Sequence, residues 1–288
     1  MASEAGRWWG RPVAEMRWQA ELLRLCVDPL FLRGGEPRGD GRPVVLVPGF
    51  GAGDWTLAHL GFWLGRTGYD AATCNFIVNA GCAEKALARV ERCVVECSER
   101  SGRRVAVLGH SRGGFLARAV GARMPERVSH VVAMGAGLTR QFDVAAPALA
   151  AVVVARAVQG RRGCLTEDCA CGFTAAYACA FPAEVRLTSI YSRGDGMVRW
   201  ESCLADYADN VEVTGSHVGL AWNRKSYRAI AAALAQPELV PQPSRSSAAV
   251  IAPAKSSTDP AAGGKRSASR PSSSGSRPKS RAARTTAR

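Results

Sequence analysis

One segment of this 288-residue chain restricts its fold more than any other, the run Val-Ala-Val-Leu-Gly-His-Ser-Arg-Gly-Gly-Phe-Leu at residues 105–116. An apolar strand pattern ends at Gly109, and a helix pattern runs from Arg112 to Arg123, so only a very tight turn separates them. The turn requires glycine at positions 109 and 113, because a Cβ at either position would collide with the adjoining strand and helix. Ser111 is therefore predicted to take a strained conformation at the positive end of a helix.

The segments on both sides of this turn alternate between strand and helix patterns. An N-terminal helix is predicted at residues 16–32 and ended by Pro29, and the further helices lie at 55–66, 83–100, 112–123 and 224–234. Strands are predicted at residues 43–47, 69–81, 103–109, 128–135, 185–193 and 210–215. This order predicts an α/β fold with a mostly parallel sheet and helices on both faces.

A long connection separates the fourth predicted strand from the fifth. It spans about 45 residues and contains an Ala/Val-rich helical stretch at 145–158. Connections of this length inside a sheet domain are typical of a lid or a binding element. We therefore expect a domain at 42–236 with a short cap insertion at about 138–184, preceded by a helical segment and linker at 1–41.

Three of the ten cysteines, Cys164, Cys169 and Cys171, cluster within the predicted cap. Metal binding is the less favoured interpretation, because the cluster has neither paired C-x-x-C spacing nor a nearby histidine. A disulfide that pins the segment is favoured over a metal, and buried reduced thiols are the simplest expectation. Cys93 and Cys97 are predicted to share one face of a helix, four residues apart.

The composition changes abruptly after Gln236. Residues 237–288 contain no aromatic side chain, 7 of the 15 prolines, 12 serines, and ten Lys or Arg against two acidic residues. Such a segment cannot bury enough apolar surface to offset the entropy of ordering, so a disordered basic tail is predicted. Because the tail carries +8 of the net charge of +14, we expect weak contacts of the tail with anionic surfaces and no specific nucleic-acid binding.

The sequence contains no pattern typical of a membrane span or an export signal. Its longest uncharged run, at 169–183, has 15 residues, whereas a spanning helix needs roughly 18 or more apolar residues. Near the N-terminus, charged residues interrupt every apolar run, unlike the apolar region of a secretory signal. These features predict a cytoplasmic protein without a transmembrane segment.

A serine in such a turn needs a base, because its hydroxyl is a weak nucleophile until an imidazole removes the proton. Three of the four histidines have positions typical of structural residues: His59 in a helix, His110 inside the turn and His130 within a strand. His217 lies in a loop after the last strand. It is therefore the predicted base.

The base in turn needs an orienting acid. Asp195 follows the strand at 185–193 inside a Gly-Asp-Gly turn, at the strand end where catalytic groups gather in open α/β sheets. Asp143 is the alternative, but it lies farther from the end of its strand. We favour Asp195. A serine, histidine and aspartate supply nucleophile, base and charge stabilisation together, so no metal or organic cofactor is expected.

Four sequence blocks in this order resemble the α/β-hydrolase superfamily, and specifically its bacterial lipase-like and esterase-like serine hydrolases: VVLVPGFG, GHSRGG, YSRGDGMV and GSHVGL. The resemblance covers about residues 40–234. It implies a catalytic triad of Ser111, Asp195 and His217 and an acyl-enzyme intermediate.

The resemblance also implies an oxyanion hole formed by two backbone N–H groups, those of Arg112 and Phe50. The Phe50 loop reads Pro-Gly-Phe-Gly, without the His-Gly pair or HGGG run of many esterases. From its position alone, the side chain of Arg112 is expected to be exposed at the start of its helix, and contact with an anionic group of the substrate is the alternative.

Substrate and acceptor remain open from the residues alone. The predicted reaction is hydrolysis of a small-molecule carboxylic ester, lipid-like and of moderate acyl length. Thioesterases and acyltransferases use the same triad, and a catalytically silent binding protein on this fold is a further alternative. The helix at 145–158 either covers an apolar acyl pocket as a lid or packs as ordinary core.

Overall fold

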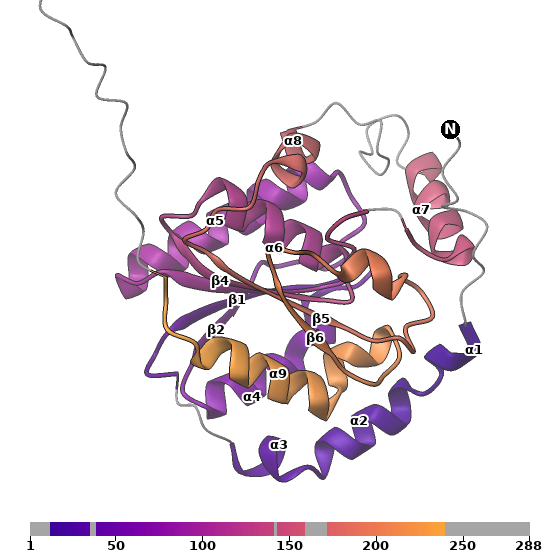
Figure 1. Cartoon of the computed structure of the whole chain (residues 1–288), viewed down its shortest axis with the longest axis horizontal. Coiled ribbons are helices and arrows are strands. Elements are labelled where there is room, and N and C mark those ends of the chain that lie inside the picture. The colour runs from indigo at the N-terminus through magenta and orange to yellow at the C-terminus, as the bar shows by residue number, and fades with distance from the viewer. Residues whose placement is uncertain (1–11, 35–38, 141–142, 159–171, 240–288) are drawn as a thin grey trace, which may run out of the picture. The chain divides into compact units, whose positions relative to one another are not determined.

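The computed structural model describes residues 12–34, 39–140, 143–158 and 172–239 (Figure 1). Within them, six strands form one parallel sheet in the order β2-β1-β3-β4-β5-β6. The strands are β1 Pro43–Val47, β2 Asp70–Thr73, β3 Val105–His110, β4 Val128–Met134, β5 Arg186–Tyr191 and β6 Asp209–Glu212. Because every pairing is parallel, all carboxyl ends lie along one edge of the sheet. The predicted parallel α/β architecture is confirmed.

Helices cover both faces of this sheet (Figure 1). One face packs against α5, α6 and α8, and the other against α4 and α9, with α2 and α3 beside them. The α-helices are α1 Pro12–Glu15, α2 Trp18–Cys26, α3 Pro29–Arg33, α4 Ala58–Arg66, α5 Ala83–Ser101, α6 Arg112–Arg123, α7 Ala146–Val158, α8 Gly172–Ala178 and α9 Arg224–Ala235. Shorter 3₁₀ turns are η1 Asp54–Leu57, η3 Trp200–Cys203 and η4 Val218–Trp222.

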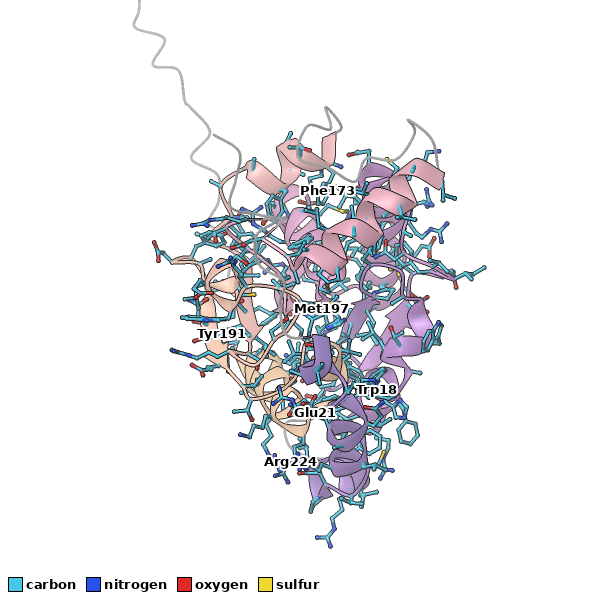
Figure 2. The ribbon with its side chains drawn as sticks, turned by 90° about the vertical axis from the view of Figure 1, so that its right-hand side faces the viewer. Trp18, Glu21, Phe173, Tyr191, Met197 and Arg224 are labelled. Carbon is cyan, nitrogen blue, oxygen red and sulfur yellow. The ribbon has the colours of Figure 1, made fainter. Side chains whose placement is uncertain are left out.

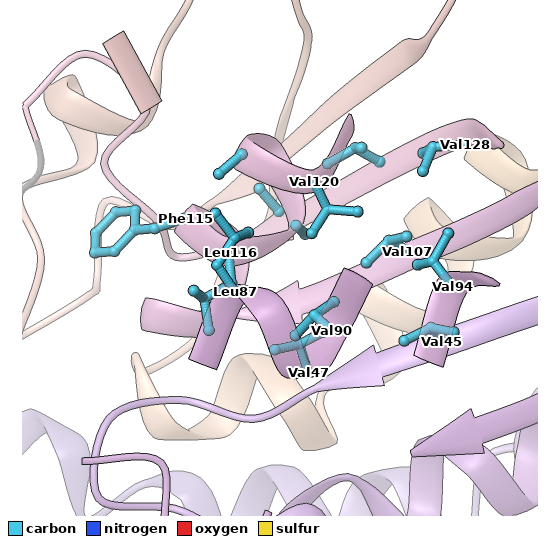
Figure 3. Packing of buried hydrophobic residues seen from close by; sticks show 14 of the residues in the cluster. Val45, Val47, Leu87, Val90, Val94, Val107, Phe115, Leu116, Val120 and Val128 are labelled. Carbon is cyan, nitrogen blue, oxygen red and sulfur yellow. The ribbon is translucent and has the colours of Figure 1, made fainter. Parts of the chain in front are cut away.

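The central strands are buried on both faces. Every residue of β1, β3 and β4 is buried, which explains why Val44–Val47 of β1 and Val105–Leu108 of β3 read as continuous apolar runs instead of alternating. Figure 3 shows Val47 of β1 near Val90 of α5, with Leu116 of α6 in the same cluster. This packing fixes α6, and with it the turn that precedes the helix.

The second predicted strand, at 69–81, is wrong in its length, because β2 ends at Thr73. Asn75 has a positive φ of 58°, which turns the chain away from the sheet. The following residues instead bond to the loop after β1: the Asp54 N–H donates to the Phe76 carbonyl at 2.9 Å, and the Phe76 N–H donates to the Asp54 carboxylate at 3.0 Å. The chain therefore leaves the sheet after β2 and is held by the loop that follows β1.

The predicted N-terminal helix at 16–32 is in fact two helices, α2 and α3, with α1 before them. Pro29 was predicted to end a helix, but it begins α3, where a backbone N–H would have no partner within the helix and its absence costs nothing. Asp28 caps α3 by accepting from the Leu30 N–H at 3.0 Å. The same carboxylate pairs with Arg228 of α9 at 3.0 Å, so α3 is fastened to the body of the domain.

The predicted cap contributes α7 and α8 to the described residues. Cys164, Cys169 and Cys171 lie outside the described residues, and so do the disulfide and metal interpretations attached to them. Cys93 and Cys97 are both buried on α5, which confirms their shared face.

The predicted tail lies outside the described residues from residue 240 onward. Its first three residues are held against the body, since the Arg186 side chain donates to the Pro237 carbonyl at 2.6 Å and the Arg104 side chain donates to the Leu239 carbonyl at 2.8 Å. Among the helices that the structure describes, none combines the length and the apolar character needed to cross a membrane.

Candidate active site

Ser111 occupies the tight turn between β3 and α6. Its backbone has φ 53° and ψ −122°, a combination that non-glycine residues rarely adopt. A Cβ at Gly109 would overlap the Gly113 carbonyl, and a Cβ at Gly113 would overlap the Val47 carbonyl oxygen. The two glycines therefore allow α6 to begin directly against the sheet, with Ser111 at its N-terminus.

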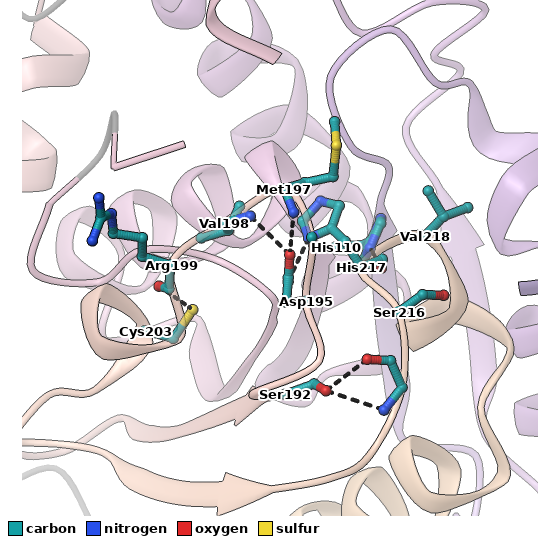
Figure 4. A network of polar contacts seen from close by, with 12 residues as sticks. His110, Ser192, Asp195, Met197, Val198, Arg199, Cys203, Ser216, His217 and Val218 are labelled. Carbon is teal, nitrogen blue, oxygen red and sulfur yellow. Dashed lines mark hydrogen bonds and ion pairs between the residues drawn. The ribbon is translucent and has the colours of Figure 1, made fainter. Parts of the chain in front are cut away.

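Asp195 and His217 form a close pair at the same edge of the sheet. The His217 Nδ1–H donates to Asp195 Oδ2 at 2.7 Å, and the two side chains are 8% and 2% exposed, respectively. The other carboxylate oxygen accepts from the Met197 and Val198 N–H groups, each at 2.8 Å (Figure 4). Asp195 is thus fixed by its own turn before it orients the imidazole.

This environment changes the protonation of His217. Burial acts to lower the pKa of His217, but the charge and hydrogen bond of Asp195, together with the charge of Glu15, outweigh burial and raise that pKa above its ordinary value. Because Nδ1 donates to the carboxylate, the neutral imidazole carries its lone pair on Nε2. Nε2 is then the nitrogen able to accept a proton from a nucleophile.

Asp143, the alternative acid, lies elsewhere. Its carboxylate pairs with the Arg199 side chain at 3.0 Å, and its carbonyl accepts from the Arg199 N–H at 3.1 Å. These contacts join the start of the cap to the segment after Asp195. The structure thus brings Asp195, and not Asp143, to His217.

His110 contacts the predicted base, which its position in the sequence did not indicate. Its Nε2–H donates to the His217 carbonyl at 2.8 Å, and the centres of the two imidazole rings are 5.0 Å apart. Burial, followed by the nearby His217, lowers the pKa of His110 to about 4, so the ring is neutral at neutral pH. His59 and His130 lie away from the site, on α4 and β4.

The loop after β1 carries Phe50 beside Ser111. Asn79 fixes this loop on both sides: its side chain donates to the Pro48 carbonyl at 2.8 Å, and its own carbonyl accepts from the Gly51 N–H at 3.0 Å. The Phe50 N–H makes no hydrogen bond within the described residues. Asn79 was missed in the sequence because it lies in the segment predicted as a strand.

Arg112 is not exposed, contrary to the sequence-based expectation. It is 9% exposed, and its guanidinium donates to the Asn79 carbonyl at 3.0 Å and to the Gly81 carbonyl at 2.6 Å. The guanidinium also lies 5.9 Å from the centre of the Phe50 ring. The side chain therefore braces the loop that faces Ser111, and does not extend toward an anionic ligand.

A cavity of about 520 Å³ opens above Ser111 and His217, lined mainly by apolar side chains. The wall includes Phe115 of α6, Phe173 of α8 and the inward residues of α7, among them Ala148 and Val152. Figure 2 shows Phe173 among the cap helices, at the top of the view. Arg112 contributes the charged side chain of the described lining, and Asp and Glu are absent from it. Among the residues that the structure describes, no cluster of potential ligands suited to a metal ion is found.

Two acidic residues of the N-terminal helices, Glu15 and Glu21, bind the loops that carry Asp195 and His217. In the sequence they belong to a segment where charged and apolar residues alternate, so no motif distinguishes them.

Comparison with known proteins gives a likeness in structure only. No protein-family model and no curated protein matches this sequence. The mature form of a lipase from Bacillus licheniformis superimposes with a TM-score of 0.52, 15% identity, and coverage of 69% of this chain and 94% of the lipase. The propeptide form of the same lipase superimposes with a TM-score of 0.53 and 15% identity, and the match covers 72% of this chain and 53% of the lipase chain. Lipase B from Aspergillus fumigatus superimposes with a TM-score of 0.50 and 18% identity, and the match covers 71% of this chain and 56% of that lipase. Together with the parallel sheet and its strand order, these likenesses show that the chain has the α/β-hydrolase fold.

Proposed function

We propose that this protein is a serine hydrolase that cleaves carboxylic esters through an acyl-enzyme intermediate. The observation that carries the proposal is the buried hydrogen bond between Asp195 and His217, at the cavity that Ser111 also lines. The strained turn presents Ser111 at the start of α6, and the base and its orienting acid converge from loops after β5 and β6.

In the proposed reaction, His217 Nε2 takes the Ser111 hydroxyl proton as Oγ attacks the ester carbonyl. The oxyanion of the tetrahedral intermediate accepts hydrogen bonds from the backbone N–H groups of Arg112 and Phe50. Collapse breaks the ester bond, and the leaving alcohol takes the proton from His217. A water molecule, deprotonated by His217, then attacks the acyl-enzyme and releases the acid and Ser111.

The cavity supports an apolar acyl group of moderate length as the substrate. Its volume of about 520 Å³ lies within the range of roughly 300–1,000 Å³ typical of small-molecule sites. Arg112 is already bonded to two backbone carbonyls, so the lining favours a neutral chain over an anionic one. Helix α7 forms one wall, as expected of a cap over an acyl pocket.

The test is hydrolysis of a p-nitrophenyl ester series from acetate to palmitate by the full chain and by Ser111→Ala. We expect an optimum at intermediate acyl length and a loss of kcat on the order of 10⁴-fold or more in the variant. Equal rates for the two proteins would refute the proposal. A matched thioester series, and product analysis with an added alcohol acceptor, distinguish ester hydrolysis from thioesterase and acyltransferase activity.

A further inference from the structure

Two carboxylates of the N-terminal helices are buried against the loops that carry the proposed acid and base. Glu15, at the end of α1, and Glu21, in α2, are each 9% exposed. Within the described part of the chain, neither carboxylate forms an ion pair with Lys or Arg. Burying a carboxylate without a cation is costly unless hydrogen bonds stabilise it, so the N–H groups around these side chains matter.

Glu15 joins the two loops directly. Its Oε1 accepts from the Gly196 N–H at 2.8 Å and from the His217 N–H at 3.0 Å, and its Oε2 accepts from the Val218 N–H at 2.9 Å. Gly196 adjoins Asp195 in sequence. One carboxylate therefore holds the backbone beside the acid and the backbone of the base, through charge-assisted hydrogen bonds that are roughly twice as strong as neutral ones.

Glu21 binds the residue before the base. Its Oε1 accepts from the Ser216 N–H at 2.9 Å, and its Oε2 accepts from the Ser216 hydroxyl at 3.0 Å. A Cβ at Gly219 would overlap this carboxylate, so the loop needs glycine there to admit it. Glu21 thus fixes the histidine loop, and within the described residues its carboxylate makes no hydrogen bond to the loop of Asp195.

Aromatic packing keeps α2 in place. The Trp18 and Trp222 rings lie 5.0 Å apart, which joins α2 to η4, and the Trp222 indole N–H donates to the Thr56 carbonyl at 3.0 Å. Figure 2 shows Trp18 and Glu21 together on α2, below Met197. Helix α2 is therefore packed against η4, the segment that follows the base.

We propose that Glu15 is a positioning residue of the active site, which ties the loops of Asp195 and His217 together and places a negative charge beside the base. The proposal rests on the proposed function, in which His217 acts as a general base. Glu21 supports the same loop by hydrogen bonds alone. Residues 12–26 thereby complete the site from outside the sheet.

Glu15 also acts on the charge state of His217. The ionisable groups facing this imidazole are Asp195, Glu15 and the neutral His110. After burial, which lowers the pKa of His217, and Asp195, which raises it, the charge of Glu15 raises it further. Loss of that charge therefore lowers the pKa of His217. The acid limb of the pH–rate profile, which reports the neutral base, moves to lower pH.

The experiment compares Glu15→Gln with the matched control Glu21→Gln in the full chain. The first readout is an NMR titration of the four histidine imidazoles, which needs no catalysis. We expect the pKa of His217 to fall by about half a unit or more in Glu15→Gln, and to change by less than half as much in Glu21→Gln. No shift in a folded Glu15→Gln protein, or equal shifts in both variants, would overturn the proposal.

The second readout is kcat/KM against pH on the best p-nitrophenyl ester. Glu15→Gln is expected to lower the plateau by about tenfold or more and to move the acid limb to lower pH. Glu15→Asp keeps the charge but shortens the reach, so its plateau falls while the limb stays near that of wild type. If Glu15→Gln fails to fold, Glu15→Asp decides: a wild-type plateau in that variant refutes the positioning role. An inactive wild type would refute the ester hydrolase proposal and leave the NMR test standing.

Discussion

Replacing Asp195 with asparagine tests the orienting acid with little change in shape. The asparagine side chain would keep an oxygen for the Met197 and Val198 N–H groups, which now donate to Asp195 Oδ1 at 2.8 Å. Its amide nitrogen would face His217 Nδ1 in place of the oxygen that accepts at 2.7 Å. Because an amide N–H donates, Nδ1 must then become the acceptor and the proton moves to Nε2.

The magnitude follows from this change of tautomer. A protonated Nε2 cannot accept the Ser111 proton, so the variant has lost its general base at neutral pH while the fold is retained. In serine proteases the equivalent change lowers kcat by about 10⁴-fold, which is roughly 5.5 kcal/mol of transition-state stabilisation. We expect a loss of this order here, with KM changed much less, because Asp195 does not line the cavity.

Asp143→Asn is the matched control, since Asp143 is the alternative acid and pairs with Arg199 instead of His217. Steady-state hydrolysis of one p-nitrophenyl ester by the two variants and wild type, with melting temperatures as a check on folding, decides between the aspartates. A loss of less than about tenfold in Asp195→Asn, or a larger loss in folded Asp143→Asn, would refute the assignment of the acid.

The remaining predictions concern stability and specificity. Burial is the main reason that the pKa of His130 falls to about 4 in the folded state, against about 6.5 in the unfolded state. The neutral imidazole therefore leaves the folded protein at its full stability above pH 6.5, and the free energy of unfolding decreases as pH falls from 6.5 toward 4. Urea unfolding of His130→Gln should therefore show a decrease between pH 7 and 4 that is smaller by about 3 kcal/mol than in wild type; an unchanged decrease would contradict this. Leu116→Ala removes a fully buried side chain and should cost about 2–5 kcal/mol of unfolding free energy, whereas a cost below about 1 kcal/mol would contradict the packing described. Ala148→Phe should narrow the cavity, raising KM for long esters at least about fivefold with acetate within about twofold; equal effects on both would remove α7 from the acyl site.

The parts of the site that the sequence predicted are those set by local geometry. The turn at Ser111 depends on glycines within two residues of it, and Asp195 is held by N–H groups two and three residues ahead. Requirements of this kind involve residues close together in the chain, so they can be recognised as sequence motifs. The strand pattern was equally effective for β1 and β3, because burial on both faces makes each a continuous apolar run.

The parts that the sequence did not predict depend on contacts between distant segments. Glu15 meets the His217 N–H across 202 residues of chain, and no periodicity records such a contact. Long-range contact also explains why the burial of Arg112 and the role of Asn79 were not predicted. The Arg112 side chain, which the start of a helix would otherwise expose, is covered by a loop 31 residues upstream. The second strand was predicted too long because the residues after Thr73 form hydrogen bonds with Asp54 instead of with a neighbouring strand.

Covalent labelling with a fluorophosphonate tests whether Ser111 is an activated nucleophile, because the reaction requires an activated serine and no knowledge of the natural ester. We expect one adduct per chain by intact mass, located at Ser111 by peptide mapping; it should be absent from Ser111→Ala and should form much more slowly in Asp195→Asn. A folded wild-type protein that stays unlabelled, or an adduct on another residue that persists in Ser111→Ala, would contradict this expectation.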